Sequence, residues 1–182
     1  MQKLKIYFYS PGFLQKREIK EYGDTPNVFI NPTPLYLDSY VKVNHPDLYE
    51  QIEWVKLQYL PLSQSDFVKE IDESDADIVA VSVYTWNNRN VISNIKDLQK
   101  HTKKNVKVII GGPSVEILRD EDYLKNLPEV DFAIYSQGEK PFVDIIKHYL
   151  GLEKISLLKT KNVAWQDQGK LKKADYEFTK LK

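Results

Sequence analysis

The sequence predicts an α/β protein built on a five-stranded, doubly wound parallel sheet in the strand order 2-1-3-4-5, with a C-terminal β-hairpin. Two observations predict this class. Short apolar runs alternate with segments of helical periodicity, and such an alternation builds right-handed βαβ units around a parallel sheet. The strongest runs are also nearly continuous in apolar residues, as expected of strands that helices cover on both faces.

The strands are predicted from five runs of apolar residues. These runs are KLKIYFYS (3–10), VKLQYLPL (55–62), DIVAVSVY (77–84), VKVIIGG (106–112) and VDFAIYS (130–136). The second run is the weaker signal, whereas the last three are rich in β-branched residues, which favour strands. Residues 162–174 alternate apolar and polar residues around a DQG turn, which predicts the hairpin.

Two helices are predicted from apolar residues at helical spacing. One occupies residues 87–102 with Asn87 or Asn88 as its N-cap, and the other ends at Gly151. Their buried faces are predicted to be Val91, Ile92, Ile95 and Leu98 in the first helix, and Phe142, Ile145, Ile146 and Tyr149 in the second. A shorter helix is expected within residues 115–126.

The domain organisation predicted from these elements is simple. Residues 1–160 are expected to form the α/β domain, and residues 161–182 the hairpin and the start of a linker. Residues 11–54 break the alternation of strands and helices, because prolines interrupt them and apolar residues cluster in their second half. That segment is expected to be an insertion with an irregular loop followed by two helices.

The composition excludes several classes of protein. Of the 182 residues, 42% are hydrophobic, and 26 basic residues balance 26 acidic ones, so neither a nucleic acid nor a membrane surface is an expected partner. The chain has no cysteine, which excludes disulfides, thiolate zinc sites and cysteine-held iron–sulfur clusters within it. No apolar stretch approaches ~18 residues and no cleavable leader is present, so a cytoplasmic protein is expected.

Ligands of open parallel sheets bind beyond the carboxyl ends of the strands, where the strand order reverses. At that edge Gly111 and Gly112 leave bare backbone for a ligand, although Gly-Gly-Pro also serves simply as a tight strand-to-helix turn. The hydroxyl of Ser82 either bonds backbone or meets a polar ligand group. Trp86 either presents a flat apolar face or packs on the next helix. Glu139 suits the first turn of a helix without any catalytic role.

No catalytic residue and no metal site are predicted. A G-x-G-x-x-G after the first strand, a P-loop and a nucleophile elbow are all absent. His45, His101 and His148 lack the spacing of metal ligands, and the last two fall late in helices that run away from the ligand edge.

Four segments in order and spacing resemble the cobalamin-binding domain that precedes the catalytic barrel in many radical S-adenosylmethionine (SAM) enzymes, a Rossmann-like or flavodoxin-like fold. They are DADIVAVSVYTWN, VKVIIGGPSVEI, LPEVDFAIYSQGEKPFVDII and NVAWQDQGKLKKADYEF. The resemblance covers about residues 75–178 well and residues 1–74 in outline.

The resemblance implies cobalamin as the cofactor. It implies that Ser82, Gly111 and Gly112 accommodate the nucleotide tail of cobalamin, and that the loop from Tyr84 to Asn87 faces the lower side of the corrin ring. The cofactor-binding residues expected on this basis are Ser82, Tyr84, Thr85, Trp86, Asn87, Gly111, Gly112, Pro113, Ser114, Gly138 and Glu139. A Gly112→Val change is expected to abolish cobalamin binding and leave the fold largely intact.

Two departures from the family's motifs matter. The loop SPGFLQKRE has no histidine, where mutase-type cobalamin proteins use D-x-H-x-x-G, so cobalt would receive no protein imidazole from it. Ser136 and Gln137 stand where the family commonly shows the first pair of Gly-Glu-Gly-Glu.

The resemblance also implies partners and a reaction. SAM and a [4Fe–4S] cluster would be held by a radical SAM barrel in cis, because this chain has no C-x-x-x-C-x-x-C motif. The parent protein would be a methyltransferase or a related radical enzyme, acting on a small molecule or peptide that the sequence does not identify. Two alternatives stay open. The domain could have lost cobalamin and serve substrate binding or interaction, with Tyr84, Trp86 or Phe13 filling the site, or it could be an unrelated flavodoxin-like enzyme domain.

Overall fold

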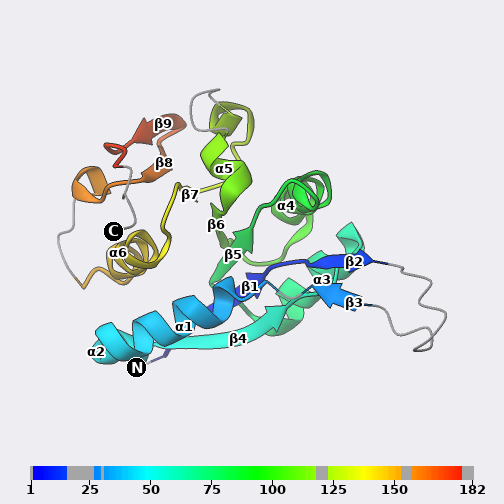
Figure 1. The fold of residues 1–182 in the computed structure, drawn as a ribbon, viewed down its shortest axis with the longest axis horizontal. Coiled ribbons are helices and arrows are strands. Elements are labelled where there is room, and N and C mark those ends of the chain that lie inside the picture. Colours follow the sequence, from blue (N-terminus) through cyan, green and yellow to red (C-terminus); the bar gives the residue numbers. More distant parts are fainter. Residues whose placement is uncertain (1, 16–26, 30, 118–122, 153–156, 178–182) are drawn as a thin grey trace.

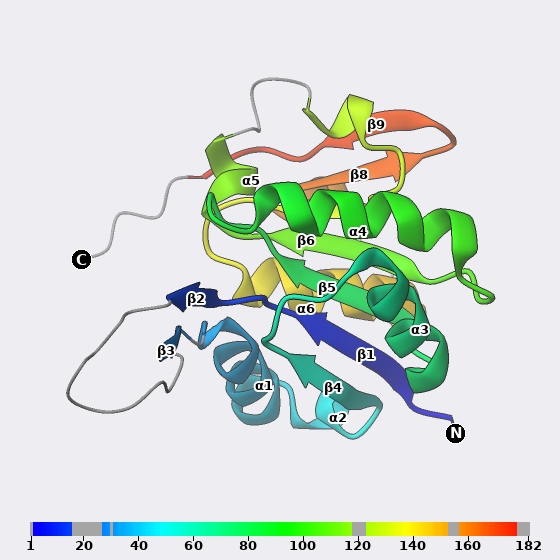
Figure 2. The ribbon, with the colours of Figure 1, turned by 90° about the vertical axis from the view of Figure 1, so that its right-hand side faces the viewer.

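The computed structural model describes residues 2–15, 27–29, 31–117, 123–152 and 157–177. Its main sheet has seven strands in the order β4-β1-β5-β6-β7-β8-β9. The strands are β1 (Leu4–Tyr9), β4 (Ile52–Gln58), β5 (Ile78–Ser82), β6 (Lys107–Gly111), β7 (Phe132–Ile134), β8 (Val163–Asp167) and β9 (Lys170–Lys173). The first five are parallel, and β8 and β9 are antiparallel additions at one end of the sheet (Figure 2). The predicted strand order and C-terminal hairpin are confirmed.

The second strand of the main sheet in chain order, β4, is displaced from its predicted position. It begins at Ile52, which pairs with Leu4 of β1, and it ends at Gln58 rather than at residue 62. The ladder ends at Gln58 because its partner there, Tyr9, is the last residue of β1. The predicted range of residues 55–62 was therefore wrong by three residues at the start and four at the end.

The helices cover both faces of the sheet. They are α1 (Thr33–Asn44), α2 (Pro46–Tyr49), α3 (Gln64–Ser74), α4 (Asn88–His101), α5 (Pro113–Ile117), α6 (Glu139–Leu150) and the 3-10 turns η2 (Tyr123–Asn126) and η3 (Leu157–Lys159). Gly151 ends α6 in the left-handed conformation, as predicted. Tyr149 was wrongly assigned to the buried face of α6, because its side chain is 40% exposed. Between α5 and η2, residues 118–122 of the expected short helix lie outside the described part of the chain.

Helix α3 was not predicted from the sequence. Ser63 is its N-cap, and the Ser63 hydroxyl accepts a hydrogen bond from the backbone N–H of Asp66. Phe67, Val68 and Ile71 form its buried face. These signals are present in the sequence, but four acidic residues within eleven positions hide the apolar stripe.

The segment 11–54 contains a regular element of the fold. Helix α1 joins β1 to β4 as the crossover of a parallel βαβ unit, and α2 adds a single turn before β4. The two expected helices are therefore present. The loop before them is not wholly irregular, because β2 (Phe13–Gln15) pairs antiparallel with β3 (Asn27–Phe29). Residues 16–26 and 30 lie outside the described residues.

The sheet separates two apolar clusters of side chains. Helices α3 and α4 cover one face of the sheet, whereas α1 and α6 cover the other (Figure 1). Side chains alternate along a strand, so Val79 and Val81 of β5 face α3 and α4, whereas Ala80 faces α1 and α6. The same alternation turns Ser82, at the end of β5, toward α1 and α6. No helix in the described part of the chain has the length and apolar character needed to cross a membrane.

Candidate cofactor-binding site

A cavity of about 260 Å³ lies at the carboxyl ends of β5, β6 and β7, on the face covered by α1 and α6. The predicted site residues that line it are Ser82, Tyr84, Gly111, Gly112, Pro113, Gly138 and Glu139. The predicted residues Thr85, Trp86, Asn87 and Ser114 do not line it. The structure therefore brings together residues from three separate loops around one hollow, and places the others around its rim or behind it.

Small residues form the floor of the cavity. Ser82 pairs with Gly111 across β5 and β6, and Gly111 pairs with Ile134 of β7. A Cβ added at Gly111 would lie 3.7 Å from Ile134 Cβ and 3.8 Å from the Ile134 carbonyl oxygen, which are ordinary contact distances. Ala80 also lines the cavity, one pleat below Ser82. The hollow exists because these positions lack large side chains. The surroundings of Gly111 would accommodate an added Cβ.

Gly112 has a different role from its neighbour. Its φ is +110°, and an added Cβ would lie 2.7 Å from the carbonyl oxygen of Val83. The two loops approach each other closely here, because the Ser114 N–H donates to that same oxygen at 3.2 Å. The expectation that Gly112→Val would leave the fold intact is therefore wrong. Gly112 is required by the backbone itself, with or without a ligand.

Two helices provide the walls, and of their lining residues only Glu139 of α6 was predicted as a site residue. Thr33, Tyr36 and Leu37 come from the start of α1, and Phe142 comes from α6. The other lining residues of the two helices do not belong to loops that follow strands. The signal that could have found α1 is its place directly after β1, because a crossover helix begins at the same edge of the sheet where its strand ends.

Asn87 is used inside the chain. Its Oδ1 accepts from the Tyr84 N–H at 2.8 Å, and its Nδ2 donates to the carbonyl oxygens of Pro11 at 3.0 Å and Ser82 at 3.2 Å. Asn87 occupies the N-cap position of α4 as predicted, but its side chain makes no capping hydrogen bond. Its buried amide instead ties the loop after β5 to the loop after β1.

An aromatic pair stands beside the cavity. The rings of Tyr84 and Trp86 stack with centroids 4.5 Å apart and planes inclined by 19°. Trp86 keeps 46% of its surface exposed. The ring stacks on Tyr84 of the same loop and stays partly exposed, and its contact with a ligand remains a prediction.

Three polar residues at this edge of the sheet differ in their surroundings. Ser114 Oγ is buried and has no hydrogen-bond partner among the described residues, which is a costly arrangement unless a ligand or water completes it. Ser136 has a φ of +60°, a conformation that costs a residue with a side chain about 1–2 kcal/mol and that glycine adopts freely. Glu139 is the first residue of α6, where the helix dipole favours its carboxylate.

The three histidines lie away from the cavity. His45 stands between α1 and α2, and His101 is the last residue of α4, with its Nε2 3.5 Å from Asp97 Oδ1. His148 is in the last turn of α6. In the described ranges, no group of three or more histidine, aspartate or glutamate side chains is arranged to hold a metal ion.

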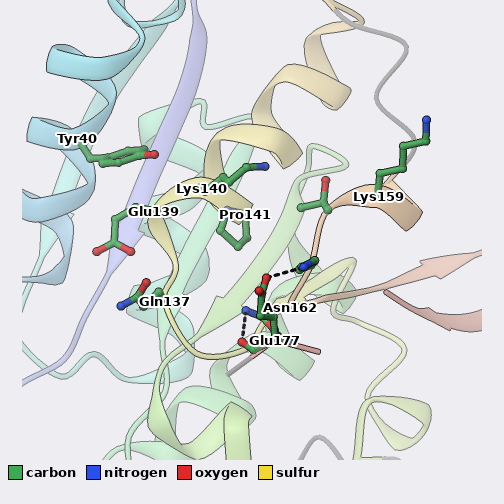
Figure 3. Close-up of a pocket in the computed structure, with 10 residues that line it drawn as sticks. Tyr40, Gln137, Glu139, Lys140, Pro141, Lys159, Asn162 and Glu177 are labelled. Carbon is green, nitrogen blue, oxygen red and sulfur yellow. Dashed lines mark hydrogen bonds and ion pairs between the residues drawn. The ribbon is translucent and has the colours of Figure 1, made fainter. Parts of the chain in front are cut away.

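A second, wider hollow of about 570 Å³ adjoins the cavity and shares Gln137 and Glu139 with it (Figure 3). Three charged side chains that line it form ion pairs. Lys140 Nζ lies 2.6 Å from Asp144 Oδ2, and Lys161 pairs with the carboxylate of Glu177. The side chain of Asn162 exchanges two hydrogen bonds with the backbone of Glu177, drawn as dashed lines in Figure 3. These contacts fasten residues 174–177 to the start of β8.

The fold and the position of the cavity define an α/β domain that binds a ligand beyond the carboxyl edge of its parallel sheet. A family model, B12 binding domain, matches residues 49–146, more than half of the chain. The chain belongs to this family of B12-binding domains. The matched residues run from α2 to α6 and include the floor of the cavity, but not β1 or α1.

One solved structure shows the same fold over nearly the whole chain. It is the apo, selenomethionine-labelled cobalamin-dependent S-adenosylmethionine radical enzyme OxsB, with a TM-score of 0.65 and 15% sequence identity. The match covers 97% of this chain and 23% of the OxsB chain. At this identity the likeness is one of fold. No curated protein matches the chain.

Proposed function

We propose that this chain is the cobalamin-binding module of a B12-dependent radical SAM enzyme. The observation that carries the proposal is the open cavity between α1 and α6, floored by Ser82 and Gly111 at the carboxyl edge of the sheet. Membership of the B12-binding domain family supports cobalamin as the ligand. The likeness to OxsB supports a parent with a radical SAM domain in cis.

The residues present fit cobalamin in two parts. Pockets that take whole ligands measure about 300–1,000 Å³, so a cavity of about 260 Å³ suits only the nucleotide tail of so large a cofactor. Gly111 leaves room for the tail and Ser82 offers it a hydroxyl. The corrin ring would then lie outside the cavity, over the exposed face of Trp86. The hydroxyl of Ser114 is buried outside this cavity, so it is not offered to a tail that lies there.

The work of this chain would be binding and orientation. Bound cobalamin would supply the cobalt centre that carries a methyl group in the parent's reaction. SAM and a [4Fe–4S] cluster would belong to the barrel, since no cysteine is present here to hold iron. Asn87 would position the Tyr84–Trp86 loop, and no residue of this chain would move a proton or form a covalent bond.

The open cavity also weighs against a domain that has lost its cofactor. In that case large side chains would be expected to fill the floor, but Tyr84 only lines the cavity and Trp86 lies outside it. The side chain of Phe13, the third residue expected to fill the site, is outside the described part of the structure. An unrelated flavodoxin-like enzyme is not supported, because the chain belongs to the B12-binding family.

The proposal is tested by co-elution. The purified chain is incubated with hydroxocobalamin and separated from free ligand by gel filtration, and the visible spectrum of the protein peak is recorded. We expect about one cobalamin per chain and a raised melting temperature, because ligand at about 100 times its Kd adds roughly 2.7 kcal/mol of stability. A colourless protein peak with an unchanged melting temperature would contradict the proposal.

The cobalt is expected to receive no imidazole from this chain, because His45, His101 and His148 stand at the C-terminal ends of α1, α4 and α6, which begin at the ligand edge and run away from it. The variant with His45, His101 and His148 all replaced by glutamine should therefore bind hydroxocobalamin with unchanged affinity and an unchanged visible spectrum. The melting temperature of the ligand-free variant controls for its folding. A spectral change with the fold intact would reveal a histidine ligand.

A further inference from the structure

The first turn of α1 has no role assigned by the family match, which begins at residue 49. Thr33, Tyr36 and Leu37, at the start of this helix, line the cavity. Leu37 is buried against the sheet, whereas Tyr36, the residue before it, lines the cavity with 64% of its surface exposed. A large aromatic ring therefore stands in water at the mouth of the cavity.

A buried polar network fixes this turn at the edge of the sheet. Asn31 Nδ2 donates to Ser10 Oγ at 2.8 Å, and Asn31 Oδ1 accepts from the backbone N–H of Thr33 at 3.1 Å and from its hydroxyl at 2.8 Å. Asn31 and Ser10 are both almost fully buried. Because Ser10 directly follows β1, the network ties the start of α1 to the strand end, and Tyr36 follows within the first turn.

Several other residues that line the cavity are apolar. Leu37, Ile109, Ile134 and Phe142 line the same cavity, so an aromatic group that entered it would contact hydrocarbon on several sides. The nucleotide tail of cobalamin ends in an aromatic base. Aromatic side chains hold such bases by stacking, and the exposed ring of a tyrosine loses no protein contact when it does so.

We infer that Tyr36 is a binding residue for the aromatic base of the nucleotide tail, and that Asn31 positions it. This inference rests on the proposed function. It assigns to the crossover helix α1 the recognition of the tail, as distinct from the corrin ring. A corrinoid without a nucleotide, such as cobinamide, would gain nothing from Tyr36.

The experiment compares cobalamin with cobinamide by titration of the whole chain, followed by visible absorbance. Tyr36→Ala should weaken cobalamin binding about 5- to 100-fold, the range that removal of one stacked aromatic side chain produces, and should leave cobinamide affinity unchanged. Tyr36→Phe keeps the ring and should retain the affinity for cobalamin. Leu35→Ala is the matched control, because Leu35 is the preceding residue of the same helix, is 51% exposed and does not line the cavity.

Three other outcomes would contradict either the role of Tyr36 or the proposed function. If the wild-type chain binds cobalamin and Tyr36→Ala binds it equally well, the role of Tyr36 is refuted and the proposed function stands. If Tyr36→Ala loses cobalamin and cobinamide to the same extent, its contact is not with the tail. If the wild-type chain binds neither corrinoid, the proposed function itself fails.

Discussion

Gly111→Val is expected to lose cobalamin while the chain stays folded. The site tolerates a side chain, because a Cβ at Gly111 would meet Ile134 only at ordinary contact distances. Valine also suits a central strand. Its methyl groups would occupy the floor of the cavity beside Ser82, where the nucleotide tail is proposed to lie. We expect the affinity for cobalamin to fall at least about 100-fold, equivalent to roughly 2.7 kcal/mol.

The measurement is a titration with hydroxocobalamin, with the ligand-free melting temperature as the test of folding. Gly111→Ala is the matched control, since a single methyl group takes less of the cavity and should cause a smaller loss. Cobinamide should bind to all three proteins alike. If Gly111→Val bound cobalamin with wild-type affinity, the placement of the nucleotide tail in this cavity would be refuted.

Gly112→Ala is expected to destabilise the fold by about 3 kcal/mol or more, with no ligand present. Alanine would have to adopt a φ of +110°, and its Cβ would lie 2.7 Å from the carbonyl oxygen of Val83. That oxygen belongs to the backbone at the end of β5, so it cannot move aside as a flexible side chain would. The free energy of unfolding in urea measures the effect.

The adjacent Gly111→Ala variant provides the comparison for Gly112→Ala. Its unfolding free energy should stay within about 1 kcal/mol of wild type, because neither its backbone conformation nor its contacts are strained. Equal stability of the two alanine variants would contradict the distinct roles given to the two glycines.

The strands that the sequence predicts well are those whose signal is local. The β-branched runs of β5 and β6 are buried on both faces, so their composition alone marks them. The DQG turn likewise marks the hairpin, where Gln168 and Gly169 both have positive φ. Strand β4 was misplaced because it is a partly exposed edge strand, and its start is set by pairing with β1. Such pairing between distant segments cannot be predicted from the local sequence.

The candidate site was predictable only in part, for a related reason. The loops after strands could be located from the sequence, and they supply Ser82, Gly111 and Glu139 to the cavity. The place of α1 after β1 indicates the edge at which it begins, but the side chains that it turns to the cavity depend on how it packs on the sheet. The different tasks of Gly111 and Gly112 were also hidden, since a backbone angle and a 2.7 Å approach arise only in the folded chain.

The proposed function depends on where the nucleotide tail of cobalamin binds. A crystal structure of this chain with hydroxocobalamin would show that position. We expect electron density for the tail between α1 and α6, in contact with Ser82 and Gly111, with the corrin ring outside the cavity over Trp86. Density for a bound cobalamin whose tail lies anywhere else on the domain would contradict the assignment.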